Sequence, residues 1–190
     1  AHIIILAQIG SYVPAKEAKI GVANKLFSRI GASDNISKGQ STFMVEMLET
    51  SNIIKNADDK SFIILDEIGR GTSTFDGLAI AWAIIEKVLR SNKSRTLFAT
   101  HYHELTEIEK TNSKVRNVSC EIKEWNDEII YSYKVIEGKS KGSLGIKVAE
   151  LAGFPSDVIA EANALLGKLQ NKEISQEGFH LKEEDFERER

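Results

Sequence analysis

Two adjacent carboxylates stand where a short apolar segment ends. Phe62 to Leu65 is an uninterrupted apolar run, and Asp66 and Glu67 follow it directly. A run of this length between polar flanks is typical of a strand buried on both faces of a parallel sheet. The first carboxylate of such a pair can hold a nucleotide-bound Mg²⁺, usually through water, and the second can orient or deprotonate an attacking water. The pair matches the Walker B pattern, although two solvated acids ending a strand are an open alternative.

Two further groups could contact phosphate. Ser41 and Thr42 open a helical pattern directly after Lys38-Gly39-Gln40, so free backbone N–H groups, two hydroxyls and the positive end of a helix dipole meet there. His101 follows Thr100 at the end of a later apolar segment, where an imidazole could exchange a hydrogen bond with a terminal phosphate. Taken singly, an ordinary helix cap and a surface histidine explain these residues better. Together with the acidic pair they favour a phosphate site.

The loop that usually grips nucleotide phosphates is missing from the sequence. No G-x-x-x-x-G-K-[ST] pattern occurs in the 190 residues. Gly138-Lys139-Ser140 is a partial match, but Tyr133 occupies the position of the first glycine and Glu137 would bring a carboxylate against the phosphates. The sequence thus predicts the metal-binding and water-activating half of an ATPase without its phosphate loop.

The intervening sequence supplies elements that could position these groups. Apolar spacing predicts a helix from Ser41 to Ala57 and another over 78–89, on either side of the strand that ends at Asp66. Thr96 to Ala99 predicts a second buried strand, which ends at Thr100-His101. Because strand, helix and strand alternate, we expect an α/β fold with a parallel sheet. A hairpin is expected from 115–123 and 128–136 around a turn at 125–127, and two helices from 144–151 and 158–169.

Composition and charge narrow the class of protein. A length of 190 residues predicts one domain plus an appendage. Lys plus Arg (25) nearly balance Asp plus Glu (28), so net charge alone does not recruit nucleic acid. The single Cys120 excludes an internal disulfide, and the longest apolar run, Leu78 to Ile85, is far shorter than the roughly 20 residues that span a bilayer. We therefore expect no membrane partner and a cytoplasmic location.

The two ends of the sequence carry separate expectations. Residue 1 is not a start Met, and His2 to Ala7 predicts the interior of a buried element, so we expect the sequence to begin inside a longer protein. Little regular structure is expected from Gly10 to Gly39. The last twenty residues carry eleven charges, which predicts disorder or a linker.

Three segments resemble the MutS family of DNA mismatch-repair ATPases: STFMVEM at 41–47, DEIGRGTSTFDG at 66–77 and ATHYHEL at 99–105. The similarity extends from Gln8 to Pro155. It implies an ABC-type P-loop NTPase core that is partial here, because in that family the first strand and the P-loop lie before residue 1. The implied activity is ATP hydrolysis by the intact protein, with ATP and Mg²⁺ as cofactors.

The resemblance also implies roles for single residues. Asp66 resembles the Walker B aspartate that directs Mg²⁺, Glu67 the catalytic glutamate, and His101 the switch histidine near the γ-phosphate. Ser41, with Thr42 beside it, resembles the signature serine that reaches a nucleotide held by the partner subunit. Tyr133 lies on a predicted strand near the place where the family has a side chain beside the adenine. The implied working form is a dimer with composite sites.

On the same basis the chain divides into a partial ABC-type ATPase domain at 1–139, a helix-turn-helix dimerisation element at 140–170 and a charged tail or linker at 171–190. The implied partners are a second MutS-like subunit, mismatched double-stranded DNA contacted through other domains, and downstream repair factors. The second helix of the pair carries Asp157 and Glu161 and no base until Lys168, which argues against phosphate binding. Its apolar side chains suit subunit packing.

Two alternative functions stay open at this point. The 190 residues could act only as an interaction and dimerisation module, inert toward ATP because the P-loop is absent. They could instead belong to a related ABC-type DNA-processing ATPase outside mismatch repair, although the Gly69–Gly77 loop resembles the mismatch-repair branch.

Overall fold

The structure is a computed structural model that describes residues 1–31, 41–125, 128–140, 142 and 144–175. The chain divides into two compact units, Ala1–Lys139 and Ser140–Arg190. In chain order the described elements are α1 (His2–Gln8), β1 (Lys25–Arg29), α2 (Thr42–Asn56), β2 (Ser61–Asp66), α3 (Thr74–Lys87), a π-helical turn η2 (Val88–Asn92), β3 (Arg95–Ala99), a 3₁₀ turn η3 (His103–Glu107), α4 (Ile108–Thr111), β4 (Val118–Trp125), β5 (Glu128–Glu137), α5 (Gly145–Leu151) and α6 (Ser156–Ser175). The turn expected at 126–127 and the tail beyond Ser175 lie outside the described residues.

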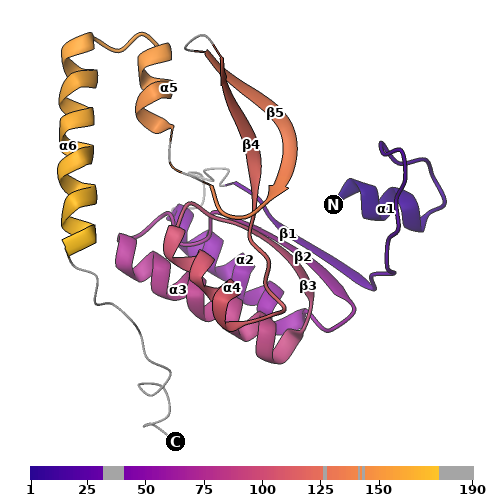
Figure 1. The fold of residues 1–190 in the computed structure, drawn as a ribbon. Helices are drawn as coiled ribbons and strands as arrows, with labels where there is room; N and C mark the ends of the chain where they lie inside the picture. The colour runs from indigo at the N-terminus through magenta and orange to yellow at the C-terminus, as the bar shows by residue number, and fades with distance from the viewer. Residues whose placement is uncertain (32–40, 126–127, 141, 143, 176–190) are drawn as a thin grey trace, which may run out of the picture. The chain divides into compact units, whose positions relative to one another are not determined.

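Three parallel strands form the framework of the first unit. β2 lies between β1 and β3, with its Ile64 opposite Ser28 on one side and Leu97 on the other. α2 connects β1 to β2, α3 leads from β2 toward β3, and both helices lie on the same side of the strands (Figure 1). Right-handed crossovers between successive parallel strands produce this arrangement. The predicted α/β class is therefore confirmed.

Strand β1 corrects the expectation of little regular structure between Gly10 and Gly39. Lys25–Arg29 pairs in parallel with Ser61–Leu65 along its whole length. The segment escaped sequence reasoning because only Leu26 and Phe27 are apolar, so neither an alternating nor a continuous apolar pattern appears. Its strand conformation comes from the ladder with β2, which is a tertiary contact.

The strands expected to be buried on both faces are covered on one face only. Along β2, the buried Ile63 and Leu65 alternate with the partly exposed Phe62 and Ile64, and on β3 Leu97 is 56% exposed. The cause is the shared side of α2 and α3, whose apolar residues pack on the face that carries Ile63 and Leu65. In addition, β3 is an edge strand of this sheet. The expectation of strands buried on both faces was therefore wrong within the described residues.

The core of the first unit consists of two apolar clusters beneath this sheet. The buried members of the first are Ile53, Ile63, Leu65, Ile68 and Val88, and those of the second are Ala81, Tyr102, Leu105 and Ile108. Phe98 of β3 packs against both clusters. Because a buried Leu or Ile side chain contributes about 1.5–3 kcal/mol, this packing fixes α2 and α3 against the strands.

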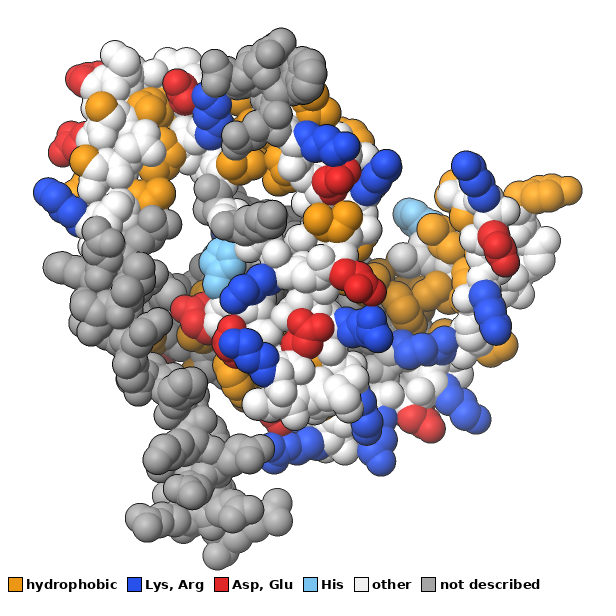
Figure 2. Space-filling view, viewed as in Figure 1, with side chains coloured by type: hydrophobic (Ala, Val, Ile, Leu, Met, Phe, Trp, Pro, Cys, Tyr) orange, Lys and Arg blue, Asp and Glu red, His pale blue; other side chains and the backbone are white. Residues whose placement is uncertain are grey.

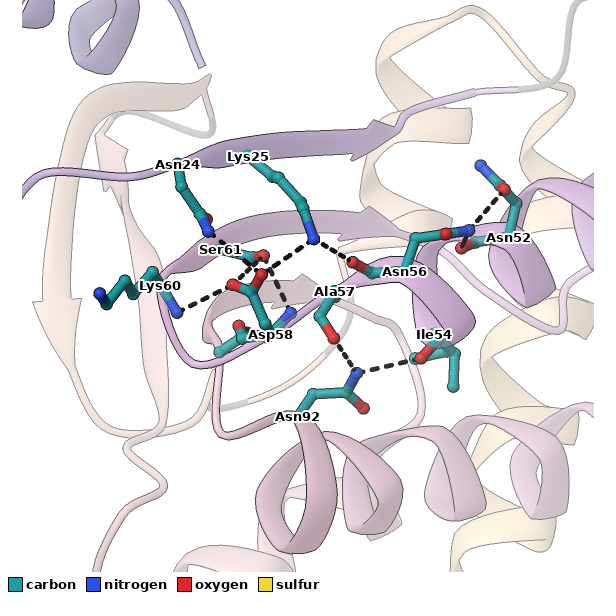
Figure 3. A network of polar contacts seen from close by, with 11 residues as sticks. Asn24, Lys25, Asn52, Ile54, Asn56, Ala57, Asp58, Lys60, Ser61 and Asn92 are labelled. Carbon is teal, nitrogen blue, oxygen red and sulfur yellow. Dashed lines mark hydrogen bonds and ion pairs between the residues drawn. The ribbon is translucent and has the colours of Figure 1, made fainter.

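A polar network at Asp58 closes the turn between α2 and β2 (Figure 3). Its carboxylate accepts hydrogen bonds from Lys25 Nζ at 2.9 Å, Asn24 Nδ2 at 3.1 Å, Ser61 Oγ at 2.9 Å and the Lys60 N–H at 3.0 Å. The Lys25 ammonium, followed by the Ser61 hydroxyl and the Asn24 amide, holds the pKa of Asp58 far below its ordinary value of 3.8. This network ties the start of β1 to the start of β2.

We expect Asp58→Asn to lower the melting temperature of the chain at pH 7. The depressed pKa means that the ionised carboxylate stabilises the folded state fully above the unfolded value near 3.8, and that this stabilisation is lost as the pH falls toward the folded value. The gap in melting temperature between wild type and variant should therefore narrow below about pH 4. Thermal melts by circular dichroism from pH 7 to pH 3 measure it, with the exposed neighbour Asp59→Asn as control. A gap independent of pH would contradict the role of the charge.

The hairpin expected at 115–123 and 128–136 is confirmed, with strand bounds shifted by a few residues. β4 and β5 pair in antiparallel fashion, but the register shifts between Cys120, opposite Val135, and Ile122, opposite Tyr131. Tyr133 lies in this irregularity, has φ +55° and is 93% exposed. A positive φ is unusual for a residue with a side chain, so the bulge turns Tyr133 out of the regular ladder.

The N-terminal helix differs from the expectation of a buried element. No residue of α1 is buried, and Ile3 and Ile5 are 41% and 46% exposed. The Gln8 side chain instead joins the end of the helix to the backbone of Ala23, donating to its carbonyl at 3.1 Å and accepting from its N–H at 2.6 Å. The helix end is thus attached by polar contacts, and Ile3 and Ile5 are exposed.

The second unit contains the two helices expected from apolar spacing. α5 and α6 are both present and in contact, and Gly153, with φ +87°, and Pro155 separate them. Within the described residues, no helix combines the length and apolar character needed to cross a membrane.

Candidate functional site

The acidic pair lies at the carboxyl edge of the parallel sheet. Asp66 is the last residue of β2 and lies opposite Ala99 of β3, and the Glu67 N–H donates to the Ala99 carbonyl at 2.9 Å. Glu67 has φ +51°, the left-handed region that costs a non-glycine residue about 1–3 kcal/mol when the surrounding structure enforces it. Such strain is typical of residues that a fold must hold in one particular direction.

Asp66 and Glu67 line one cleft of about 270 Å³. Its wall comes from three segments: the end of β1, the first turns of α2, and the turn after β2. The lining residues are Arg29, Gly31, Thr42, Phe43, Glu46, Asp66, Glu67, Arg70 and Gly71. This volume lies near the lower end of the roughly 300–1,000 Å³ of typical small-molecule pockets and leaves room for phosphate groups and an ion.

The N-terminus of α2 forms one side of the cleft. Ser41 caps this helix, and its Oγ accepts a hydrogen bond from the Met44 N–H at 3.1 Å. Thr42, the first helical residue, lines the cleft directly. The structure therefore gives the Ser41 hydroxyl the ordinary capping role, while the positive end of the helix dipole adjoins the acidic pair through Thr42. The preceding Lys38, Gly39 and Gln40 lie outside the described residues.

Side chains from α2 and from the segment after β3 hold the turn that follows β2. Gly69 has φ +89°, its N–H donates to Glu46 Oε1 at 2.7 Å, and its carbonyl accepts from the Tyr102 hydroxyl at 3.0 Å. A Cβ on Gly77, in the first turns of α3, would lie 2.2 Å from the Gly69 oxygen. The backbone of this turn thus passes against α3 with no space for a side chain.

Charged groups of both signs meet in the cleft. Arg70 forms an ion pair with Glu67. The side chain of Arg29 is buried, with its Nε 3.0 Å from Glu49 Oε2 and its Nη2 3.8 Å from Glu46 Oε2. Arg29 and Glu49 form an ion pair, but Arg29 Nε makes no hydrogen bond among the described residues. On the face drawn in Figure 2, acidic and basic side chains are likewise interspersed over the surface of the first unit.

The donor groups fit a phosphate-bound Mg²⁺. Mg²⁺ usually takes one or two protein carboxylates and fills its remaining positions with water and phosphate oxygens. Asp66 supplies such a carboxylate, and the Thr42 hydroxyl and the guanidinium groups of Arg29 and Arg70 suit phosphate. Within the described residues, no group of three or more His, Cys, Asp or Glu side chains could hold a metal ion.

The remaining predicted site residues do not line this cleft. His101 follows β3 at the same edge of the sheet as Asp66; it is exposed, and its ring centroid lies 4.6 Å from that of Tyr102. Tyr133 lies on the hairpin and is 93% exposed. The structure therefore brings Asp66, Glu67 and Thr42 together in one cleft. Ser41 precedes Thr42 in the chain, and His101 follows the strand next to that of Asp66. Tyr133 is not among the lining residues.

Sequence reasoning gave no role to three residues that shape the site: Arg29, Glu46 and Tyr102. Glu46 alone carried a usable signal, because it lies three residues after Phe43 and seven before Ile53 and so shares their face of the helix. An acid at such a position needs a buried partner. Arg29 and Tyr102 find their partners through tertiary contacts that local spacing does not reveal.

Comparison with known proteins supplies the family. A sequence model of MutS domain V matches residues 1–170. The DNA mismatch repair protein MutS of Thermodesulfovibrio yellowstonii is 56% identical over 174 residues, which cover 92% of this chain and 20% of that protein. The proteins of the same name from Clostridium tetani and Ehrlichia chaffeensis are 56% and 54% identical over 96% and 91% of this chain. The chain spans about a fifth of the length of these relatives. This chain belongs to the MutS family of DNA mismatch-repair proteins.

Proposed function

We propose that this chain is part of the ATP-binding and ATP-hydrolysing domain of a MutS mismatch-repair protein, with an ABC-type ATPase core. In the intact protein, nucleotide state controls a dimeric clamp on mismatched DNA. One observation carries the proposal: Asp66 and Glu67 end the central parallel strand in a cleft that also contains the first residue of α2. The carboxylate pair at the strand end suits a metal-bound phosphate, and the adjoining helix N-terminus suits a phosphate of a second nucleotide.

The residues of this cleft divide the chemistry among them. When bound, Mg²⁺ neutralises charge on the phosphates, and Asp66 is the residue that holds it. Glu67 orients the attacking water and accepts its proton, and Arg70 pairs with the Glu67 carboxylate at the mouth of the cleft. Ser41 and Thr42 present the positive end of α2 to phosphate, which in the working dimer belongs to a nucleotide of the partner subunit. His101 would contact the terminal phosphate of a bound nucleotide, and Tyr133 its adenine.

Titration with ATP and Mg²⁺ tests this function. A full-length MutS protein that contains this segment should bind and hydrolyse ATP, and mismatched duplex DNA should change its turnover rate. The 190-residue chain alone should bind ATP weakly in a calorimeter, because the cleft offers no P-loop. Failure of the full-length protein to hydrolyse ATP would contradict the proposal. Tight binding by the short chain would contradict the view that its phosphate contacts are incomplete.

The second unit supports dimerisation as an additional function. α5 and α6 expose apolar side chains, and Figure 2 shows such side chains along both helices. The large apolar side chains that are more than a third exposed are Val148, Leu151, Val158, Leu165, Leu166 and Leu169. Val158, Leu165 and Leu169 share one stripe of α6. A stripe of this kind suits packing against a second copy of the helix pair.

We expect Leu165→Glu to weaken self-association by roughly 10- to 100-fold. Leu165 is 51% exposed, so its loss costs the folded unit little, whereas an interface would bury it at about 1.5–3 kcal/mol. Sedimentation velocity over a range of concentrations measures the dissociation constant. Ala160→Glu, an exposed position on the opposite side of α6, is the matched control. Equal effects of the two substitutions would contradict an interface on this stripe.

A further inference from the structure

We propose that Glu46 is a positioning residue for the turn after β2, residues 67–71, which we call the catalytic turn. It acts through its hydrogen bond to the backbone N–H of Gly69. The inference deepens the proposed function, because it names the group that holds the segment carrying Asp66, Glu67 and Arg70 in place. Glu46 lies on α2, far from this turn in sequence, and is 8% exposed.

The chemistry of Glu46 is that of a buried charge with dedicated partners. Its Oε1 accepts from the Gly69 N–H at 2.7 Å, and its Oε2 lies 3.8 Å from Nη2 of the buried Arg29. A carboxylate removed from water is strongly unfavourable unless it is paired and hydrogen-bonded. Because a charged acceptor makes a shorter and stronger bond to a backbone N–H than a neutral one does, Glu46 holds the position of Gly69 more firmly than an amide could.

Tyr102 holds the same glycine from its other side. The hydroxyl of Tyr102, which is 6% exposed, donates to the Gly69 carbonyl at 3.0 Å. Burial, followed by the charges of Glu46 and Glu104, raises the pKa of Tyr102, so the hydroxyl keeps its proton at neutral pH. The N–H and the carbonyl of Gly69 are therefore both held by buried side chains, one from α2 and one from the segment after β3.

The turn needs such a hold because its backbone is strained. Glu67, two residues before Gly69, has φ +51°, and a residue with a side chain keeps this conformation only where the surroundings enforce it. Releasing Gly69 would let Glu67 relax, and small displacements of a catalytic group reduce rates strongly. Glu46 also lies one helical turn after Thr42 and lines the same cleft as Asp66. It therefore links the N-terminus of α2 to the turn that carries the acids.

Two substitutions at Glu46 test the proposal, with a control on the same helix. Glu46→Ala removes the acceptor, whereas Glu46→Gln keeps an oxygen for the Gly69 N–H and removes only the charge. Thr50→Ala is the matched control, because Thr50 is 3% exposed on the same face and its hydroxyl has no hydrogen-bond partner among the described residues. Steady-state ATP hydrolysis is measured in the full-length protein, and amide hydrogen exchange of residues 67–71 in the 190-residue chain.

We expect Glu46→Ala to lower kcat by roughly 10- to 100-fold with little change in KM, and to speed exchange at Gly69 by about tenfold or more. Glu46→Gln should restore most of both, and Thr50→Ala should move neither. Should Glu46→Ala prevent folding, Tyr102→Phe, which removes a single hydroxyl, must produce the same two changes to a smaller extent. Unchanged exchange at Gly69, or equal kcat for Glu46→Ala and Thr50→Ala, would overturn the inference. If the wild type does not hydrolyse ATP, the proposed function fails, while the exchange data still decide whether Glu46 holds the turn.

Discussion

Glu67→Gln is expected to slow ATP hydrolysis by roughly 10²- to 10⁴-fold while leaving ATP binding close to that of the wild type. The amide has nearly the shape of the carboxylate but cannot accept a proton from the attacking water. Asp66 keeps its place at the end of β2, because Glu67 holds the ladder to Ala99 through its backbone N–H and not its side chain. The variant should therefore retain nucleotide and accumulate the ATP-bound state.

Single-turnover hydrolysis and nucleotide binding, both in the full-length protein, measure the two quantities separately. Glu109→Gln is the matched control, since Glu109 is an exposed carboxylate on α4 outside the cleft. The turnover of this control should equal that of the wild type. Hydrolysis that is unchanged in Glu67→Gln would remove Glu67 from the mechanism, and equal loss of binding and hydrolysis would indicate a structural role instead.

The placement of Asp66, Glu67 and His101 at one edge of the sheet was the easiest feature of the candidate site to predict, for a topological reason. In a parallel sheet the carboxyl ends of all strands meet at one edge, so residues that follow two apolar runs must lie near each other. Asp66 and Glu67 follow β2, and the segment leading to His101 follows β3, as the spacing predicts. Ser41 and Thr42 begin α2, which is also visible from apolar periodicity and a capping residue.

The parts of the site that the sequence did not predict are those that depend on contacts between distant segments. Strand β1 lacks an apolar pattern, so its terminal Arg29 could not be placed in the cleft. The hold on Gly69 by Glu46 and Tyr102 joins residues separated by more than twenty positions in each case. The sequence likewise predicts how apolar a strand is but not which neighbours cover it, as the exposed Leu97 illustrates.

The contact between Gly69 and Gly77 leads to the second strong prediction: Gly77→Ala should destabilise the chain by about 1–3 kcal/mol, the usual cost of overpacking a filled interior. The added Cβ would lie 2.2 Å from the Gly69 oxygen and 2.3 Å from the Tyr102 hydroxyl oxygen. The Gly69 oxygen belongs to a backbone that Glu46 also holds, so it cannot simply move aside. In an unobstructed helix the same change would stabilise by up to about 1 kcal/mol, so the sign of the effect depends on this crowding.

Gly167→Ala provides that unobstructed comparison within the same chain. Gly167 lies in α6, and a Cβ there would meet no atom within 4 Å among the described residues. Urea titration followed by circular dichroism should show a lower free energy of unfolding for Gly77→Ala and an equal or higher one for Gly167→Ala. Because the new methyl group displaces the Tyr102 hydroxyl from the Gly69 carbonyl, amide exchange at residues 67–71 should also accelerate in Gly77→Ala alone. If Gly77→Ala were as stable as Gly167→Ala, the close approach of α3 to the catalytic turn would be wrong, and with it the account of how Glu67 is held.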